Sequence, residues 1–273
     1  MMGMLDGKVA FITGAARGQG RSHAIRFARE GADIVALDIC DQVPTVAYDL
    51  ATSDDLVETA AAVEALGRRI IARQGDVRDI DRLKEVVAEG ESELGGLDII
   101  VANAGIAAMG SEDDPSAVFR DLLDINLVGV YNTVIAAVPS LIEKRSGAIV
   151  LTSSTQGLKG TGGNGSGGAS GYAASKHGVV GLMRSFTHWL GPMGIRVNTV
   201  HPTGVATPMI QNPHVERLFA ENPEAFGDSV SNILPVPWVE SNDVSDAVLY
   251  LVSEMGRYVT GVALPVDAGF TAR

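Results

Sequence analysis

Short apolar runs alternate along the chain with longer stretches of helical periodicity. The short runs are rich in β-branched residues and favour strands, whereas the longer stretches favour amphipathic helices. This alternation predicts parallel βαβ units. The expected strands are Lys8–Thr13, Asp33–Asp38, Arg69–Gly75, Leu97–Ala102, Ala148–Thr152, Arg196–His201 and Ala263–Val266. The expected helices lie near Gly18–Glu30, Ser53–Leu66, Ile80–Leu94, Val118–Glu143, Tyr172–Leu190 and Asp243–Ser253.

Several expected strands are apolar along their whole length, as at Ile99–Ala102. Such strands are typical of a sheet that helices cover on both faces. Right-handed crossovers then give a Rossmann-type, doubly wound α/β fold, which binds ligands beyond the carboxyl ends of its strands. No linker, repeat or change in composition divides the sequence. The chain, residues 1–273, is therefore expected to form a single domain.

Three segments interrupt the alternation. Ile39–Thr52 is a long insertion after the second expected strand, and Lys159–Gly171 is a run of seven glycines among polar residues that is expected to be flexible. Pro208–Pro237 is polar, contains several prolines and follows a strand end. Because loops beside strand ends often cover active sites, we expect residues 208–237 to form a substrate lid.

Composition narrows the classes of function. Hydrophobic residues make up 46% of the chain and charged residues 20%, the balance of a soluble globular protein. The net charge of −12 argues against a nucleic-acid partner. No secretory signal pattern is visible, and no apolar run approaches the roughly 18 residues that cross a bilayer, so no membrane partner is expected. The single cysteine, Cys40, fits a reducing cytoplasm.

A glycine-rich turn, Thr13–Gly20, joins the first expected strand to the first helix. Glycine permits a tight turn there, and the helix N-terminus favours a pyrophosphate, although an ordinary strand–helix turn looks the same in isolation. Asp38 ends the second strand 18 residues after Gly20. Its carboxylate would bind both ribose hydroxyls of an adenosine and repel a 2′-phosphate. Arg17 would attract that phosphate, but beside Asp38 it leaves NAD favoured over NADP.

Two further strand ends carry candidate cofactor residues. Asp76 and Val77 close the third strand, where a carboxylate and a backbone amide would read an adenine edge. Asn103, Ala104 and Gly105 close the fourth, where small residues leave room for a cofactor. Each motif alone fits simple turn chemistry. Together the successive strand ends predict one edge lined by a dinucleotide.

Tyr172 and Lys176 are spaced one helical turn apart on the same face of a helix. An alcohol releases hydride readily only when its hydroxyl proton is removed, and a free tyrosine with a pKa near ~10 is a poor base at neutral pH. A lysine ammonium and an oxidised nicotinamide would both favour the phenolate. The pair predicts a general base, although an isolated tyrosine–lysine pair is usually a surface feature.

Taken together, these motifs resemble the short-chain dehydrogenase/reductase family over nearly the whole chain, from Lys8 to Asp267. The resemblance implies a seven-stranded parallel sheet and a homotetramer. It rests on the Thr13–Gly20 turn, Asp76, Asn103–Gly105, Asn126, Ser154, Tyr172 with Lys176, Pro202–Thr207 and Val266–Asp267.

The resemblance also implies residue roles. Ser154, three residues before Gly157, takes the place of the family's catalytic serine, which hydrogen-bonds the substrate oxygen, and leaves Ser153 a turn or cofactor contact. Asn126 would hold, on its backbone carbonyl, a water that connects Lys176 to solvent; a buried structural asparagine is the alternative. Tyr172 and Lys176 also contact the cofactor. The remaining cofactor-binding residues would be Gly14, Arg17, Gly18, Gln19, Gly20, Asp38, Asp76, Val77, Asn103, Ala104, Gly105, Pro202, Thr203, Val205 and Thr207.

Two departures from the family pattern stand out. Thr203 occupies a position where glycine is common, which affects the geometry beside the nicotinamide carboxamide. Ser154 and Tyr172 lie 18 positions apart, more than is common in the family, and the excess falls around Gly160–Gly168. A surface bulge would absorb it, or it would reshape the substrate pocket or a subunit contact.

A narrower resemblance points to the mycofactocin-associated, carveol-dehydrogenase-like subgroup, through Gly14–His23, the insertion and His201–Val205. It implies that the insertion buries NAD, that an external redox carrier reoxidises it, and that the substrate is a small secondary alcohol or ketone, such as an apolar cyclic one. The alternatives are a 3-oxoacyl thioester reductase, which Asp38 disfavours, and a nucleotide-binding subunit without turnover. No metal-ligand spacing is present, and His23, His177 and His201 are expected to be structural.

Overall fold

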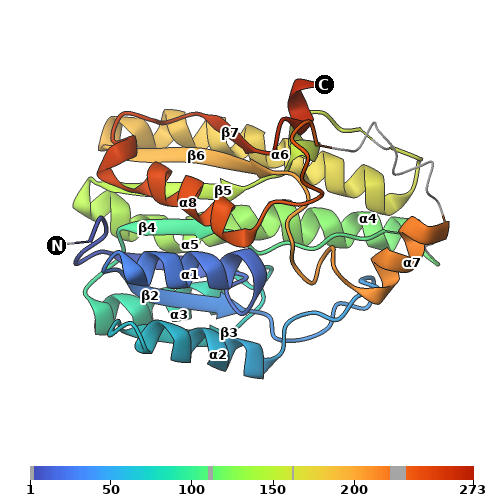
Figure 1. Ribbon diagram of the computed structural model, residues 1–273. Helices are drawn as coiled ribbons and strands as arrows, with labels where there is room; N and C mark the ends of the chain where they lie inside the picture. The colour runs from blue at the N-terminus through green and yellow to red at the C-terminus, as the bar shows by residue number, and fades with distance from the viewer. Residues whose placement is uncertain (1–2, 110–112, 162, 222–231) are drawn as a thin grey trace.

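The structure, a computed structural model, describes residues 3–109, 113–161, 163–221 and 232–273. Its seven strands pair in parallel in one sheet with the order β3-β2-β1-β4-β5-β6-β7. This is the doubly wound, Rossmann-type arrangement that the sequence predicts (Figure 1). The strands are β1 Val9–Thr13, β2 Asp33–Asp38, β3 Ile70–Gln74, β4 Ile99–Ala102, β5 Gly147–Thr152, β6 Ile195–Pro202 and β7 Ala263–Val266.

Helices cover both faces of the sheet (Figure 1). Side chains of α1, α2 and α8 pack on one face, and those of α3, α5 and α6 pack on the other. The strands alternate between the two layers: Phe11 of β1 points into one and Ile12 into the other, and both are fully buried. The helices are α1 Gly18–Arg29, α2 Ser53–Glu64, α3 Ile80–Leu94, α4 Pro115–Leu123, α5 Gly129–Lys144, α6 Gly167–Leu190, α7 Pro213–Glu221 and α8 Ser241–Val252.

The single helix expected at Val118–Glu143 is interrupted in the structure. It begins at Pro115, because the Asp114 side chain caps the first turn and proline suits the first helical position. A π-helical turn, η1 Asp124–Val128, then separates α4 from α5. Asn126 lies within this turn, fully buried. Apolar periodicity does not reveal such a turn, since the same face of the helix stays apolar on either side of it.

The end of the glycine-rich run, residues 167–171, is helical. Helix α6 begins at Gly167, five residues before the expected start, with the Ser166 side chain accepting a hydrogen bond from Ala169. Gly171 is buried against α4: a β-carbon there would lie 3.1 Å from atoms of Phe119 and Leu122. The absence of side chains thus lets two helices approach closely, which outweighs the low helix propensity of glycine.

Residues 115–144 also qualify, by length and composition, as a helix able to cross a membrane, contrary to the expectation that no run approaches that length. In the fold, 67% of the most apolar window is buried within the protein. Most of the apolar residues of this stretch therefore belong to the core. Of the expected lid, α7 is helical and residues 222–231 lie outside the described residues.

Candidate active site

The turn after β1 requires glycine at several positions. Gly14 and Gly18 have φ values of +67° and +54°, and a β-carbon on Gly14 would lie 2.8 Å from the Cα of Ala104. Helix α1 follows at once, and no side chain among the described residues caps its N-terminus. Its first N–H groups therefore face the turn, an arrangement that suits an anion.

Gly20 differs from the other glycines of the turn. A β-carbon on Gly20 would lie 1.9 Å from the carbonyl oxygen of Gly14, so this glycine lets α1 pack against the turn from behind. Among the described residues, Gly20 is not on the wall of the cleft. The turn needs Gly20 for its shape, and the expectation that it touches the cofactor is not supported by its position.

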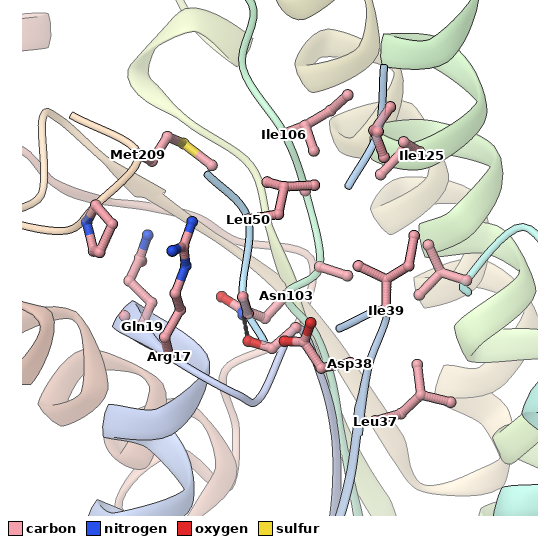
Figure 2. A pocket seen from close by; sticks show the side chains of 18 of the residues that line it. Arg17, Gln19, Leu37, Asp38, Ile39, Leu50, Asn103, Ile106, Ile125 and Met209 are labelled. Atoms are coloured by element: carbon pink, nitrogen blue, oxygen red, sulfur yellow. Dashed lines mark hydrogen bonds between the residues drawn. The ribbon is translucent and has the colours of Figure 1, made fainter. Parts of the chain in front are cut away.

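A cleft of about 900 Å³, counted out to its open mouth, lies beyond the carboxyl ends of β1, β2, β3 and β4. Figure 2 shows Arg17 and Gln19 on one side of it and Ile106 and Ile125 on the other, with Asp38 and Asn103 between them. The side-chain oxygen of Gln19 is buried and has no hydrogen-bond partner among the described residues. The predicted residues on its wall are Gly14, Arg17, Gly18, Gln19, Asp38, Asp76, Val77, Asn103, Ala104, Gly105 and Thr207.

The carboxylate of Asp38 is buried at the end of β2 and accepts backbone N–H groups from Ala16 at 2.9 Å and Cys40 at 3.3 Å. Burial raises the pKa of Asp38, and those N–H groups and the nearby Arg17 oppose the rise. The Arg17 guanidinium donates to the carbonyl of Asp49 in the insertion. Arg17 is thus engaged with the insertion, which weakens the argument that it attracts a 2′-phosphate.

Asn103 and Asp76 already have protein partners. The Asn103 amide donates to the carbonyl oxygens of Thr13 at 3.1 Å and Gly14 at 3.3 Å, so it ties the end of β4 to the glycine-rich turn. The Asp76 carboxylate accepts from the Arg78 backbone N–H at 2.8 Å and from its guanidinium at 2.6 Å. Both side chains therefore shape the cleft, whether or not they also contact a ligand.

The insertion after β2 forms a further wall of the cleft. Ile39, Val43, Tyr48, Leu50 and Ala51 all line it, although the sequence pattern indicated none of them individually. The Tyr48 phenol is buried, and its oxygen accepts from the Ala107 backbone N–H at 3.3 Å. Burial raises the pKa of Tyr48 to about 12, so this phenol is neutral. Tyr48 is the one aromatic residue of the insertion, and this was the signal that would have identified it.

The predicted catalytic residues meet at the ends of β5 and α6. Ser154 and Tyr172 share a hydrogen bond despite the 18 positions between them, so the glycine-rich excess does not separate them. Lys176 is buried one helical turn on, and its Nζ donates to the Thr152 carbonyl at 2.9 Å. That nitrogen lies 5.6 Å from the centre of the Tyr172 ring. Ser153, the neighbouring serine, instead donates its hydroxyl to the Lys176 carbonyl at 2.9 Å.

Burial is the largest influence on the pKa values of Tyr172 and Lys176. It raises the pKa of Tyr172, and the hydrogen bond with Ser154 acts in the opposite direction. It lowers the pKa of Lys176 to about 8. The lowering of the Tyr172 pKa that was expected from the lysine is therefore outweighed by desolvation. An oxidised nicotinamide bound beside the ring would add to the groups that favour the phenolate.

Asn126 fixes the loop that follows β4. Its side-chain oxygen accepts from the Ile106 N–H at 2.8 Å, and its amide nitrogen donates to the Ile106 carbonyl at 2.9 Å. A β-carbon on Gly105 would lie 3.2 Å from the Asn126 oxygen and 3.5 Å from Lys176 Nζ, so these three residues are neighbours. The side chain thus has a structural task, and the role expected of its backbone carbonyl stays a prediction.

The segment after β6 forms a compact unit with the end of the expected lid. The Thr203 hydroxyl donates to the Asn232 side chain at 3.0 Å, and a β-carbon on Gly204 would lie 2.4 Å from the Trp238 ring. Val205 pairs with Val239 and is buried. Among the described residues, Pro202, Thr203 and Val205 are not on the cleft wall, whereas Thr207 is. The expectation that Val205 binds the cofactor stays a prediction.

The three histidines considered above have protein partners, as expected of structural residues. His23 is buried beside Ser245, with Nδ1 2.8 Å from its hydroxyl, and burial lowers the pKa of His23 to about 3. His177 faces the Ala173 carbonyl of its own helix. His201, which is buried, lies against Ser154, a contact that the sequence did not indicate. No cluster of potential metal ligands occurs in the described part of the chain.

Comparison with known proteins identifies the family. Residues 8–217 match the family model of the short-chain dehydrogenases. The chain belongs to the short-chain dehydrogenase family. This dehydrogenase is 53% identical over 267 residues to an uncharacterized oxidoreductase of Mycobacterium tuberculosis, covering 97% of each chain. It is 51% identical to the (−)-trans-carveol dehydrogenase of Rhodococcus erythropolis, with each covered in full.

A solved structure supports the same relationship. Carveol dehydrogenase from Mycobacterium avium in complex with NAD superimposes on this dehydrogenase with a TM-score of 0.92 at 50% identity, covering 99% of this chain and 100% of that one. A short-chain dehydrogenase from Mycobacterium paratuberculosis bound to NAD gives 0.91 at 48% identity, over 99% and 100% of the chains. The subgroup resemblance that the sequence suggested is therefore confirmed for carveol dehydrogenases.

Proposed function

We propose that this protein is an NAD-dependent oxidoreductase that interconverts a small, apolar secondary alcohol and its ketone, with a carveol-like ring as the substrate class. The observation that carries the proposal is the cluster of Ser154, Tyr172 and Lys176, whose lysine lies next to Gly105 on the wall of the cleft that Asp38 also lines. The 51% identity to a carveol dehydrogenase over the full chain supports the substrate class.

The cleft fits a dinucleotide in three respects. Gly14 and Gly18 leave space for backbone to approach a pyrophosphate, and the uncapped N-terminus of α1 faces it. The unpartnered Gln19 oxygen awaits a hydrogen-bond donor. Asp38 holds a carboxylate where a ribose would lie, and it would repel the 2′-phosphate of NADP. The apolar wall made by Ile106, Ile125 and the insertion would cover the adenosine.

The residues then divide the proton chemistry among them. Bound NAD supplies the acceptor for the hydride that leaves the alcohol carbon. The Tyr172 oxygen takes the proton of the alcohol during oxidation and returns it during ketone reduction. The Ser154 hydroxyl donates a hydrogen bond to the substrate oxygen, where negative charge develops. Lys176, fixed by the Thr152 carbonyl, places a positive charge that stabilises the phenolate.

The insertion, residues 39–52, supports a further part of the proposal, that NAD stays bound between turnovers and that an external redox carrier reoxidises it. Hydrogen bonds hold the insertion at both sides of the cleft. Arg17 donates to Asp49 on the side of the glycine-rich turn, and Thr45 donates to Asp121 of α4 at 2.6 Å on the other. NAD would leave only after such contacts break. A reducing cytoplasm, which suits the half-buried thiol of Cys40, is the proposed location.

A homotetramer is the proposed assembly. Val128, Tyr131 and Trp189 are exposed on the layer of α5 and α6, and the Phe186 ring stacks on Tyr131 and lies tilted against Trp189. Met255 and Tyr258 are exposed beyond α8, on the other layer. Large apolar side chains on two separate faces provide two different self-complementary contacts, and two such contacts generate a tetramer with three twofold axes.

Three measurements test the proposal together. The purified protein is denatured and its nucleotide identified by mass spectrometry, and turnover is followed with a panel of cyclic secondary alcohols with and without added NAD and an artificial electron acceptor. We expect bound NAD and turnover that depends on the acceptor. Rapid exchange with free NAD would remove the retained-cofactor part while leaving the dehydrogenase intact.

The Tyr172→Phe variant tests the proposed proton transfer. We expect kcat to fall about 10³-fold, since the phenol oxygen is the proton acceptor, while nucleotide content stays unchanged. Normal turnover by this variant would show that another group carries the proton.

A further inference from the structure

We infer that His201 is a positioning residue for the proposed catalytic serine: its ring holds the Ser154 peptide in place from the neighbouring strand. The inference rests on the proposed role of Ser154 and adds a residue to it. His201 lies at the end of β6 and is fully buried. Its Nδ1 lies 2.8 Å from the Ser154 carbonyl oxygen, and its Nε2 lies 2.8 Å from the Thr199 hydroxyl.

The two partners fix the state of the ring. A carbonyl oxygen only accepts hydrogen bonds, so the proton of the imidazole must be on Nδ1. In a neutral ring Nε2 is then an acceptor, and the Thr199 hydroxyl donates to it. Burial and the charge of Lys176 both lower the pKa of His201, which keeps the ring neutral. The ring therefore presents one N–H, and it points at Ser154.

Main-chain pairing alone does not hold Ser154. The ladder between β5 and β6 ends at the pair Thr152 and Val200, with one more bond from the Ser153 N–H to the Val200 carbonyl at 2.9 Å. Ser154 follows with extended dihedrals, φ −166° and ψ 164°, and starts the short turn η2, Thr155–Gly157. Beyond the end of the ladder, the His201 side chain connects the end of β6 to the segment that follows β5 by a hydrogen bond.

Each of the three residues before the turn is held by a separate hydrogen bond. The Thr152 carbonyl accepts from Lys176 Nζ, the Ser153 hydroxyl donates to the Lys176 carbonyl, and the Ser154 carbonyl accepts from His201. The Gly157 N–H adds a second bond to Ser154 at 2.9 Å, but it comes from the same short turn and moves with it. The hydrogen bond from His201 thus comes from outside the turn, and it sets the position at which the Ser154 hydroxyl meets Tyr172.

A matched pair of substitutions separates this role from a general packing role. In His201→Asn the amide nitrogen occupies the position of Nδ1 and can still donate to Ser154, whereas in His201→Gln it extends toward Thr199 in place of Nε2. We expect His201→Asn to keep kcat within about threefold and His201→Gln to lose about 30-fold, because small displacements of a reacting group are costly. KM and NAD content should change less than about threefold, since the ring is fully buried and both of its nitrogens contact protein groups.

The Ser154→Ala background provides the second arm, as a double-mutant cycle. Single-turnover rates at high enzyme concentration are compared for His201→Gln with and without Ser154→Ala. The loss of rate caused by His201→Gln should shrink to less than about twofold when the serine hydroxyl is absent. If His201→Gln does not fold, Thr199→Val replaces it, with an expected loss of about fivefold that also disappears in the Ser154→Ala background.

The outcomes are distinguishable. Equal rates for the Asn and Gln variants, or an undiminished effect in the Ser154→Ala background, would overturn the role of His201 and leave the proposed active site in place. Full activity of Ser154→Ala by itself would overturn the proposed role of the serine, and the role of His201 with it.

Discussion

Lys176 illustrates how a residue with a proposed catalytic role lowers the stability of the fold that carries it. Its ammonium group is buried, with the Thr152 carbonyl as its hydrogen-bond partner. Desolvation lowers the pKa of Lys176 from 10.5 to about 8. The shift corresponds to about 3 kcal/mol of lost stability while the group is charged in both the folded and unfolded states. Residues selected for chemistry often carry such a cost.

The variant Lys176→Met should therefore be inactive and more stable. Removing the charge recovers about 3 kcal/mol and the lost hydrogen bond costs about 1 kcal/mol, so a net gain of about 2 kcal/mol is expected at pH 7. The folded-state pKa lies below the unfolded one, so the wild type gains stability as pH rises from 8 toward 10.5. The advantage of the variant should be full below pH 8 and shrink above it.

Thermal or denaturant unfolding between pH 6.5 and 10 measures this difference. Lys84→Met is the control, because that lysine is exposed and, within the described part of the chain, pairs with Asp81 alone, on the same helix. Its effect should stay below about 0.5 kcal/mol. A Lys176→Met variant less stable than the wild type at pH 7 would mean that other contacts compensate for the buried charge.

Among the secondary-structure elements, the sequence predicted those that follow a local hydrophobic period. It missed the features that depend on contact with a segment distant in sequence. Strand positions followed from β-branched apolar runs, and the observed strands agree to within a few residues. The π-helical turn at Asn126 depends on a bond to Ile106, which is distant in sequence. The helical start at Gly167 depends on contact with α4. Both features are set by tertiary packing, which no local period encodes.

The site was predictable to a similar degree. Motifs at strand ends placed the glycine-rich turn, Asp38 and Ser154 along the carboxyl edge of the sheet, because a parallel sheet brings its carboxyl ends together. The helical spacing of Tyr172 and Lys176 placed these two residues on one face of α6, and the roles of all these residues stay predictions. The walls supplied by the insertion, and the contact of His201 with Ser154, required coordinates. The motifs of these segments indicated a subgroup of the family, but not which of their side chains would line the cleft or contact Ser154.

The insertion is the element whose contacts make the clearest kinetic prediction. Thr45→Val removes the hydrogen bond to Asp121, and we expect bound NAD to be released about fivefold faster, equivalent to ~1 kcal/mol for a partly exposed bond to a carboxylate. Exchange of bound NAD for isotopically labelled NAD, followed by mass spectrometry, gives the rate.

A matched control exists at the other end of the chain. The Thr271 hydroxyl donates to Asp267 at the same distance, 2.6 Å, and neither residue lines the cleft. Thr271→Val should therefore leave the exchange rate unchanged. If Thr45→Val exchanged NAD at the wild-type rate, the bond to Asp121 would have no part in retaining the cofactor.

At the scale of the whole molecule, the proposed tetramer connects assembly to chemistry. Helix α6 carries Tyr172 and Lys176 on its inner side and exposes Trp189 near its C-terminal end. A subunit contact over α5 and α6 would bury Trp189 and Tyr131 and hold the helix that positions the proton-transfer residues. The contact beyond α8 lies on the opposite layer and would carry no such residue.

Charge substitutions on the two faces should thus give different results. Tyr131→Glu with Trp189→Glu introduces like charges at the first contact, and Met255→Glu with Tyr258→Glu does so at the second, so each pair should reduce a tetramer to a dimer by light scattering. We expect the first dimer to lose about tenfold in kcat and the second to lose less than about threefold. In the proposed mechanism, the residues that act with NAD all belong to one subunit, so a fully active first dimer would show that catalysis does not depend on assembly. A monomeric wild type would contradict the proposed tetramer.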